Sequence, residues 1–176
     1  MNVQQLILDS INNSVVNVFS TMLGVELAAG EASTEQSAPD VNDGVVSFIG
    51  VAGSWAGTGS ISCSPTLACR ICAQMLMTEA TAVNEEVLDA VAELTNMVIG
   101  NVKTDLEKEV GPLGLSIPTV VFGRNFKTKS AGTTEWTVVR FPWDGECLLV
   151  KVCLAPHDKA THMHHHMSGH ISALEV

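Results

Sequence analysis

The chain has 176 residues, 46% of them hydrophobic and 16% charged, and its nineteen acidic and nine basic residues give a formal net charge of −10. This length and composition predict a globular protein with one sizeable core, and they exclude collagen-like, disordered and disulfide-scaffold classes. The acidic balance disfavours nucleic acid and anionic membranes as partners and favours a basic patch on a partner. No apolar run reaches the roughly 20 residues that a membrane-spanning helix needs, and the first residues do not resemble a signal peptide, so we expect a cytoplasmic protein.

The amino-terminal part predicts a helix followed by a strand pair. Apolar positions recur with a helical period over residues 3–23, and Gly24 is a suitable stop. The small polar residues 30–40 indicate a loop. The segments GVVSFIGV and ISC then predict two strands joined by the glycine-rich turn AGSWAGTGS. This turn lacks the Gly-Lys-Ser/Thr ending of a phosphate-binding loop, so a hairpin is the better interpretation.

Two helices and a second hairpin follow. Ser64 and Pro65 are suited to the cap and first position of a helix that continues through LACRICAQML. Asn84 is suited to cap a longer helix, which ends in GPLG. The segment PTVVFG predicts a strand, and residues 134–155 predict a hairpin that turns at its Asp-Gly pair.

This order of elements predicts an α+β fold, with two long helices and a shorter one packed on a mainly antiparallel sheet. Residues 1–155 are expected to form one domain. All six histidines fall in the last twenty residues, so residues 156–176 are expected to form a flexible His-rich tail, which could also hold stray metal. A helix-plus-strand-pair order occurs twice, in 3–62 and 85–154, although no sequence identity supports a repeat.

The residue types present limit the chemistry of the domain. Residues 1–156 contain no histidine, which argues against a histidine-activated nucleophile, a His-ligated zinc enzyme and a histidine proton shuttle. The five cysteines lie in apolar runs and predict reduced, buried thiols. The CRIC segment is a single C-x-x-C without a second pair, so a zinc or redox role rests on weak spacing. We therefore expect no metal site in the domain.

The helix that begins after Asn84 has an unusual polar face. At about 100° per residue, Asp89, Glu93, Asn96 and Gly100 fall within about 40° of Asp89 on the side opposite the apolar face. A solvated surface explains Asp89, but asparagine gains nothing in an exposed helix interior, and glycine costs about 1 kcal/mol there. Glycine also indicates that another backbone approaches closely. The apolar face consists of Val87, Leu88, Val91, Leu94, Val98, Val102 and Leu106.

A glutamate and an asparagine without a histidine suit only part of an active site. A neutral carboxamide can hold a water by donating and accepting hydrogen bonds without repelling a phosphoryl group. Phosphoryl transfer depends on positioning and charge stabilisation more than on a strong base. The carboxylate would suit a lysine or a metal that belongs to a partner. The pattern therefore predicts a face that completes the active site of another protein.

The stretch DAVAELTNMVIGNVKTDLE resembles the signature helix of the CheX/CheC/FliY family of chemotaxis phosphatases. In that family an Asp or Ser is followed four residues later by Glu and a further three residues later by Asn, which matches Asp89, Glu93 and Asn96. The continuation NMVIGNVK is also similar, and the resemblance makes Asp89, Gly100 and Lys103 candidates for partner-binding or supporting residues. The segments VVSFIGVAGSWAGTGSI and IPTVVFGRNF resemble the hairpin of the family and the strand after its helix.

The resemblance implies hydrolysis of the aspartyl phosphate of the response regulator CheY. Asn96 would orient the attacking water, Glu93 would pair with a lysine of the regulator, and the regulator would bring Mg²⁺ and the phosphoryl group. CheC-type members carry a second Glu-x-x-Asn on the first helix, where this chain has Asn13 and Val16. The chain is therefore identified as CheX-like, with one site per chain and an expected homodimer joined through its sheets. The alternative is a non-catalytic module that docks a regulator or a motor-switch component through the same face.

Overall fold

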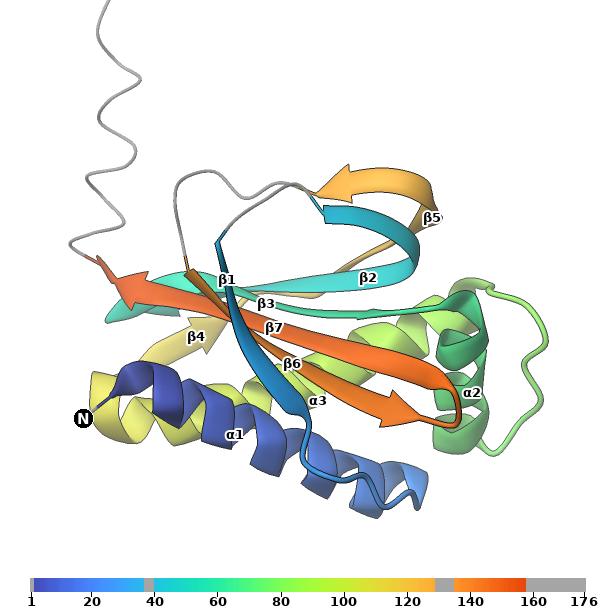
Figure 1. Ribbon diagram of the computed structural model, residues 1–176, viewed down its shortest axis with the longest axis horizontal. Coiled ribbons are helices and arrows are strands. Elements are labelled where there is room, and N and C mark those ends of the chain that lie inside the picture. The colour runs from blue at the N-terminus through green and yellow to red at the C-terminus, as the bar shows by residue number, and fades with distance from the viewer. Residues whose placement is uncertain (1, 37–39, 129–134, 158–176) are drawn as a thin grey trace, which may run out of the picture.

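A computed structural model of the protein describes residues 2–36, 40–128 and 135–157. Three helices cover one face of a seven-stranded antiparallel sheet, which confirms the predicted α+β class (Figure 1). None of the helices in these ranges combines the length and hydropathy that crossing a bilayer requires. The helices are α1 (Val3–Val18), which continues as the π-helix η1 (Phe19–Leu23), α2 (Pro65–Leu76) and α3 (Glu85–Val110). The strands are β1 (Glu31–Gln36), β2 (Asp40–Gly53), β3 (Trp55–Cys63), β4 (Leu113–Leu115), β5 (Thr119–Thr128), β6 (Glu135–Trp143) and β7 (Glu146–Pro156).

The helix ends follow from local sequence. The side chain of Ser64 accepts a hydrogen bond from the Leu67 amide at 3.1 Å, and proline occupies the first position of α2, as predicted. The Asn84 side chain accepts from the Val87 amide at 2.9 Å and so begins α3. Gly24 ends the first helical segment in the left-handed region, with φ 66°.

The sheet consists of two interlocked units. Its strand order is β1-β6-β7-β3-β2, and β4 and β5 both pair with the remaining edge of β2. Read through β5, this order is symmetric about the β7–β3 pair: β1 corresponds to β5, β6 to β2 and β7 to β3. Each unit contains a helix and three of these strands, β1–β3 after α1 and β5–β7 after α3, with β4 as an additional strand in the second unit. The order repeated in the sequence had a strand pair in each unit, so the structure has one strand more in each. The two long helices pack together, and Ser14 of α1 donates a hydrogen bond to the Val98 carbonyl of α3 at 2.9 Å.

Two predicted loops are strands. Residues 30–40 contain β1, whose polar residues pair with β6 at an edge of the sheet. The glycine-rich turn is also mostly strand, because only Ser54 separates β2 from β3. A Cβ on Gly57 would overlap the Cys153 carbonyl oxygen of β7, and one on Gly59 would lie 2.8 Å from Ile99 of α3. These glycines therefore admit a neighbouring strand and the third helix.

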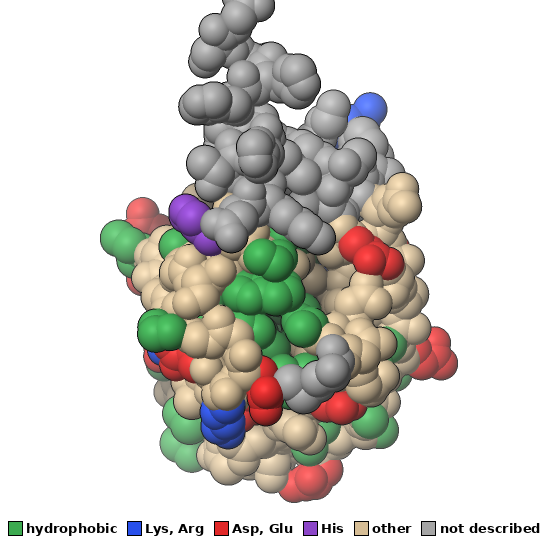
Figure 2. Space-filling model, turned by 90° about the vertical axis from the view of Figure 1, so that its left-hand side faces the viewer, with side chains coloured by type: hydrophobic (Ala, Val, Ile, Leu, Met, Phe, Trp, Pro, Cys, Tyr) green, Lys and Arg blue, Asp and Glu red, His purple; other side chains and the backbone are tan. Residues whose placement is uncertain are grey.

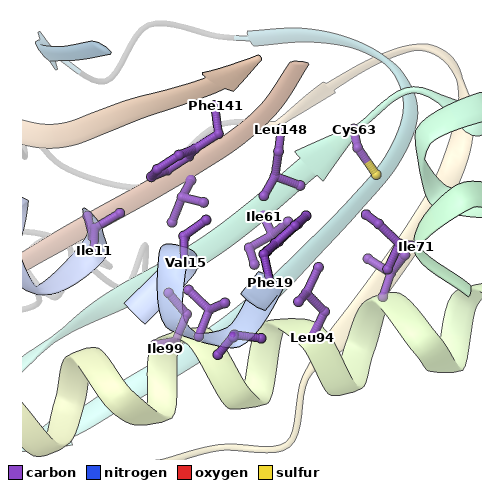
Figure 3. Packing of buried hydrophobic residues seen from close by; sticks show 14 of the residues in the cluster. Ile11, Val15, Phe19, Ile61, Cys63, Ile71, Leu94, Ile99, Phe141 and Leu148 are labelled. Atoms are coloured by element: carbon purple, nitrogen blue, oxygen red, sulfur yellow. The ribbon is translucent and has the colours of Figure 1, made fainter. Parts of the chain in front are cut away.

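The core lies between the helices and the inner face of the sheet. Figure 3 shows Phe19 of η1 and Leu94 of α3 among residues from β3, β6 and β7. Phe19 and Phe141 are fully buried and are the largest side chains in this cluster. The end of the molecule where α1 begins shows a hollow with apolar side chains, and scattered acidic side chains lie around it (Figure 2). The helix layer is thus held rigidly on the sheet and presents one face of α3 outward.

Candidate functional site

The candidate site lies on the outer face of α3. Asn84 caps this helix, and Glu85 and Glu86 occupy its first turn, where the helix dipole favours negative charge. Six of the seven residues predicted for its apolar face are buried, and the seventh, Leu88, is half-buried. The buried set is Val87, Ala90, Val91, Leu94, Thr95, Val98, Ile99, Val102 and Leu106.

The predicted polar row is brought together as the helical period requires. Asp89, Glu93 and Asn96 are all exposed, and their side chains make no hydrogen bond or ion pair with the part of the chain that the structure describes. The row from Asp89 to Asn96 extends about 10 Å along the helix. Glu93 and Asn96 lie about one turn apart, so one bound molecule could contact both. These groups are therefore free for a partner.

Gly100 extends the row by a further turn. A Cβ at this position would meet only Leu115 Cδ1 of β4, at 3.9 Å, which is ordinary van der Waals contact. The close backbone approach expected from the sequence is therefore not found within the described chain. The glycine instead leaves space beside Asn96 on the outer surface.

Lys103 is engaged within the fold. Its ammonium group lies 2.8 Å from Glu107 Oε2, and Glu107 Oε1 accepts a hydrogen bond from the Leu113 amide at 2.9 Å. The hydrogen bond from Lys103, together with that from Leu113, holds the pKa of Glu107 below its usual value. Through Glu107, Lys103 thus links the end of α3 to β4. Unlike Asp89, Glu93 and Asn96, it is paired within the fold.

The first helix carries no equivalent pair. Asn13 and Val16 of α1 occupy the places that correspond to Glu93 and Asn96 at a spacing of 80 residues, and both pairs lie at the outer surface of their helices. Neither α1 residue is a carboxylate, and Val16 cannot hold a water. The two helices therefore differ: α3 carries a Glu/Asn pair, and the corresponding positions of α1 do not.

The cysteines and histidines offer little for metal or redox chemistry. Within the described ranges, no three His, Cys, Asp or Glu side chains come together as metal ligands would. Burial raises the pKa of the Cys63 thiol to about 12, with further contributions from Glu146 and Cys69. Burial also raises the pKa values of Cys69 and Cys72, the two cysteines of the CRIC segment. His157 is exposed, and the other five histidines lie outside the described residues.

An exposed apolar residue lies in the segment between β4 and β5, the two strands of this edge that contact α3. This residue is Ile117, with an exposed fraction of 87%. In the sequence it is an ordinary residue before a strand, and its exposure becomes apparent only in the structure.

Comparison with known proteins places this fold and helix in one family. Residues 45–141 match the family model described as chemotaxis phosphatase CheX. The CheY-P phosphatase CheX of Thermotoga maritima is 32% identical over 127 residues, covering 72% of this chain and 81% of the relative. The chain therefore belongs to the CheX family of chemotaxis phosphatases.

Solved structures agree with this assignment. A CheC-like superfamily protein from Shewanella sp. PV-4 is 28% identical, with a TM-score of 0.75, over 88% of this chain and 99% of that chain. The CheX of a CheX-CheY-BeF₃-Mg²⁺ complex from Borrelia burgdorferi is 25% identical, with a TM-score of 0.65, over 85% of this chain and 96% of that chain.

Proposed function

We propose that the protein is a cytoplasmic phosphatase that hydrolyses the aspartyl phosphate of a CheY-like response regulator. The observation that carries this proposal is the pair Glu93 and Asn96, exposed, unpaired and one turn apart on a rigidly packed helix. The Borrelia relative that was solved with CheY, BeF₃ and Mg²⁺ supports a regulator of this kind as the partner. Each component of the reaction that the row lacks would then come from the regulator.

In the proposed reaction, Asn96 positions the nucleophile. Its carboxamide would accept a hydrogen bond from a water and donate one toward the phosphoryl group, with the water oxygen held in line with phosphorus. Attack by the water forms the new P–O bond while the P–O bond to the regulator's aspartate breaks. The products are inorganic phosphate, which carries the water oxygen, and the free aspartate carboxylate. Mg²⁺ bound to the regulator would stabilise charge on the phosphoryl oxygens.

Glu93 would pair with a lysine of the regulator and so hold the two proteins in register. Replacing Glu93 with alanine should lower kcat/KM for phosphate release by about 10- to 100-fold, because a hydrogen bond to a charged group contributes about 1.5–3 kcal/mol. The measurement is phosphate release from a Mg²⁺-bound, phosphorylated CheY-like regulator.

The matched control for this prediction is Glu109→Ala, which removes an exposed carboxylate of the same helix that points about 160° away from Glu93. We expect Glu109→Ala to change kcat/KM by less than about threefold, since an exposed charge away from the row contributes little. Equal losses in the two variants would show that the overall negative charge matters, and the specific role of Glu93 would be rejected.

Gly100 is expected to serve the partner, because no part of the described chain needs a glycine there. Gly100→Ala should stabilise the protein by about 0.5–1 kcal/mol, since alanine is the better helix former and its Cβ would fit. The same methyl group would displace the docked regulator and lower phosphatase activity; a misplacement of about 1 Å can cost about 100-fold. Thermal unfolding and phosphate release, measured on the same preparation, should show higher stability together with lower activity. A stabilised variant with full activity would contradict this prediction.

We also propose that the protein is a homodimer joined through its sheets. In the described chain the outer edge of β5 has no neighbouring strand, and Val121 and Phe122 on it have exposed fractions of 37% and 48%. An exposed apolar edge is a template for strand pairing. Sedimentation equilibrium should give twice the mass of the chain, and a monomer at all micromolar concentrations would contradict the dimer.

A further inference from the structure

Ile117 is an unusually exposed apolar residue in a well-fixed segment. Among the large hydrophobic residues of the described chain, only Met77, with an exposed fraction of 96%, is more exposed than Ile117 at 87%. A single exposed isoleucine is common at protein surfaces, but Ile117 differs in how firmly its backbone is held and in the charge that lies nearby.

The backbone around Ile117 is held in place by β2. The Gly50 amide donates to Ser116 Oγ at 2.8 Å, and the Ser116 amide donates to the Gly50 carbonyl at 2.9 Å. The Ser116 hydroxyl also donates to the Ile117 carbonyl at 3.0 Å, and Pro118 restricts the backbone on the other side. The exposed side chain is thus presented by a fixed backbone.

The strand pairing shows that this segment is a bulge. Leu115 pairs with Val51 and Thr119 pairs with Phe48, so four steps along one strand oppose three steps along β2. An extra residue of this kind re-aims side chains, and bulges are common beside active sites. The bulge lies in the stretch that carries Ile117, between the two strands that contact α3.

Two contacts show the direction in which β4 runs along α3. The Leu113 amide donates to Glu107 Oε1 at 2.9 Å, and Leu115 Cδ1 lies 3.9 Å from the Cβ position of Gly100. From Leu113 to Leu115 the strand therefore advances from the turn of Glu107 toward that of Gly100. Ile117 follows Leu115, and the strands on both sides of it, β4 and β5, contact α3. This bracketing places Ile117 near the stretch of α3 that leads from Gly100 toward Asn96.

The charge beside Ile117 indicates what could cover it. From Glu85 to Val102, α3 contains four acidic residues and no lysine or arginine. Asp89 and Glu93 on its exposed face would attract a partner surface that carries a cation. Ile117 would then contact an apolar side chain next to that cation. A regulator whose lysine pairs with Glu93 would therefore cover Ile117 as well.

We infer that Ile117 is a docking residue for the phosphorylated regulator and contacts an apolar side chain next to the regulator's lysine. This inference rests on the proposed function and deepens it: the row on α3 acts on the phosphoryl group, and the bulge selects the protein that carries it. Ile117 contributes to recognition and makes no contribution to the chemical step.

The test compares Ile117→Ser with Met77→Ser, because Met77 is the other nearly fully exposed apolar residue and lies at the far end of α2. Binding is measured to a CheY-like receiver of the same organism, loaded with Mg²⁺ and beryllofluoride, which replaces the phosphoryl group without being hydrolysed. Ile117→Ser should raise Kd and KM by about 10- to 100-fold, the range expected when an isoleucine can no longer be buried, and should leave kcat within about threefold. Met77→Ser should change neither value.

Unchanged binding in Ile117→Ser, or an equal loss in Met77→Ser, would overturn the inference. It would also be overturned if sedimentation showed that Ile117→Ser dissociates a dimer, since Ile117 would then face a second copy of this chain. Because binding to the beryllofluoride form is measured separately, a wild type that binds but does not accelerate hydrolysis would reject the phosphatase proposal and still decide the role of Ile117. A wild type that does not bind the receiver would overturn both.

Discussion

Replacing Asn96 with alanine is expected to lower kcat for receiver dephosphorylation by about two to three orders of magnitude, the loss typical when one preorganised hydrogen-bonding group is removed from a reacting centre. Asn96 is exposed and has no partner within the described chain, so its removal disturbs no packing. Binding of the beryllofluoride-loaded receiver should stay within about twofold, because the water that Asn96 holds contributes to the chemical step. The measurement is single-turnover decay of the phosphorylated receiver at saturating protein.

The control for this prediction is Asn101→Ala, which replaces another exposed asparagine of α3. At about 100° per residue, position 101 points about 140° away from position 96. It should therefore leave both the rate and the binding unchanged. If Asn96→Ala kept more than about a third of the wild-type rate, or if both variants lost activity equally, Asn96 would not be the residue that positions the water.

Replacing Phe19 with alanine is expected to cause the largest loss of stability, about 3–5 kcal/mol in the free energy of unfolding. Phe19 is fully buried in η1, and its ring contacts Trp143 edge to face, with 5.6 Å between ring centroids and an interplanar angle of 86°. The cost combines the lost burial of the ring, the cavity that remains and the lost aromatic pair. Denaturant titration measures this loss directly, and the melting temperature should fall by roughly 6–20 °C.

Met22→Ala serves as the control, since Met22 lies in the same π-helical segment with an exposed fraction of 50%. Its effect should be within about 0.5 kcal/mol, as for most exposed positions. The rate per folded molecule should be unchanged in Phe19→Ala, because Phe19 does not lie on the polar row. A loss below about 1 kcal/mol would show that the core relaxes around this position, contrary to the packing in Figure 3.

The helices could be predicted from sequence because their ends carry local chemistry. Ser64, Asn84 and Gly24 begin or end helices through contacts with residues only a few positions away. The turn between β6 and β7 could be predicted in the same way, because Asp-Gly favours a hairpin turn. Asp144 and Gly145 both adopt positive φ there, at 47° and 78°. The predicted fold class follows from these elements.

Strands that depend on distant partners could not be predicted in the same way. The residues of β1 are polar, and they form a strand because β6, about 100 residues later, supplies the backbone partners. The three residues of β4 lie in a segment that reads as a helix terminator. Gly57 and Gly59 suggested a turn, yet they are required where β7 and Ile99 approach β3.

The candidate site shows the same difference between features set by local sequence and features set by tertiary structure. Helical periodicity alone placed Asp89, Glu93, Asn96 and Gly100 in one row, because positions on one helix need no tertiary information. The ion pair between Lys103 and Glu107 depends partly on tertiary structure, because the amide of Leu113 also holds Glu107. The position of Ile117 depends on the pairing of β4 and β5 with β2. The sequence therefore predicted the candidate chemical residues and missed the proposed docking residue.

Phosphatase activity is tested most directly by phosphate release from a large excess of Mg²⁺-bound, phosphorylated receiver in the presence of a catalytic amount of the wild-type protein. We expect release to rise in proportion to the concentration of the protein and to continue for many turnovers. A receiver that binds the protein and still loses phosphate at its own intrinsic rate would contradict the proposed activity. In that case the row of α3 would be the face of a docking module.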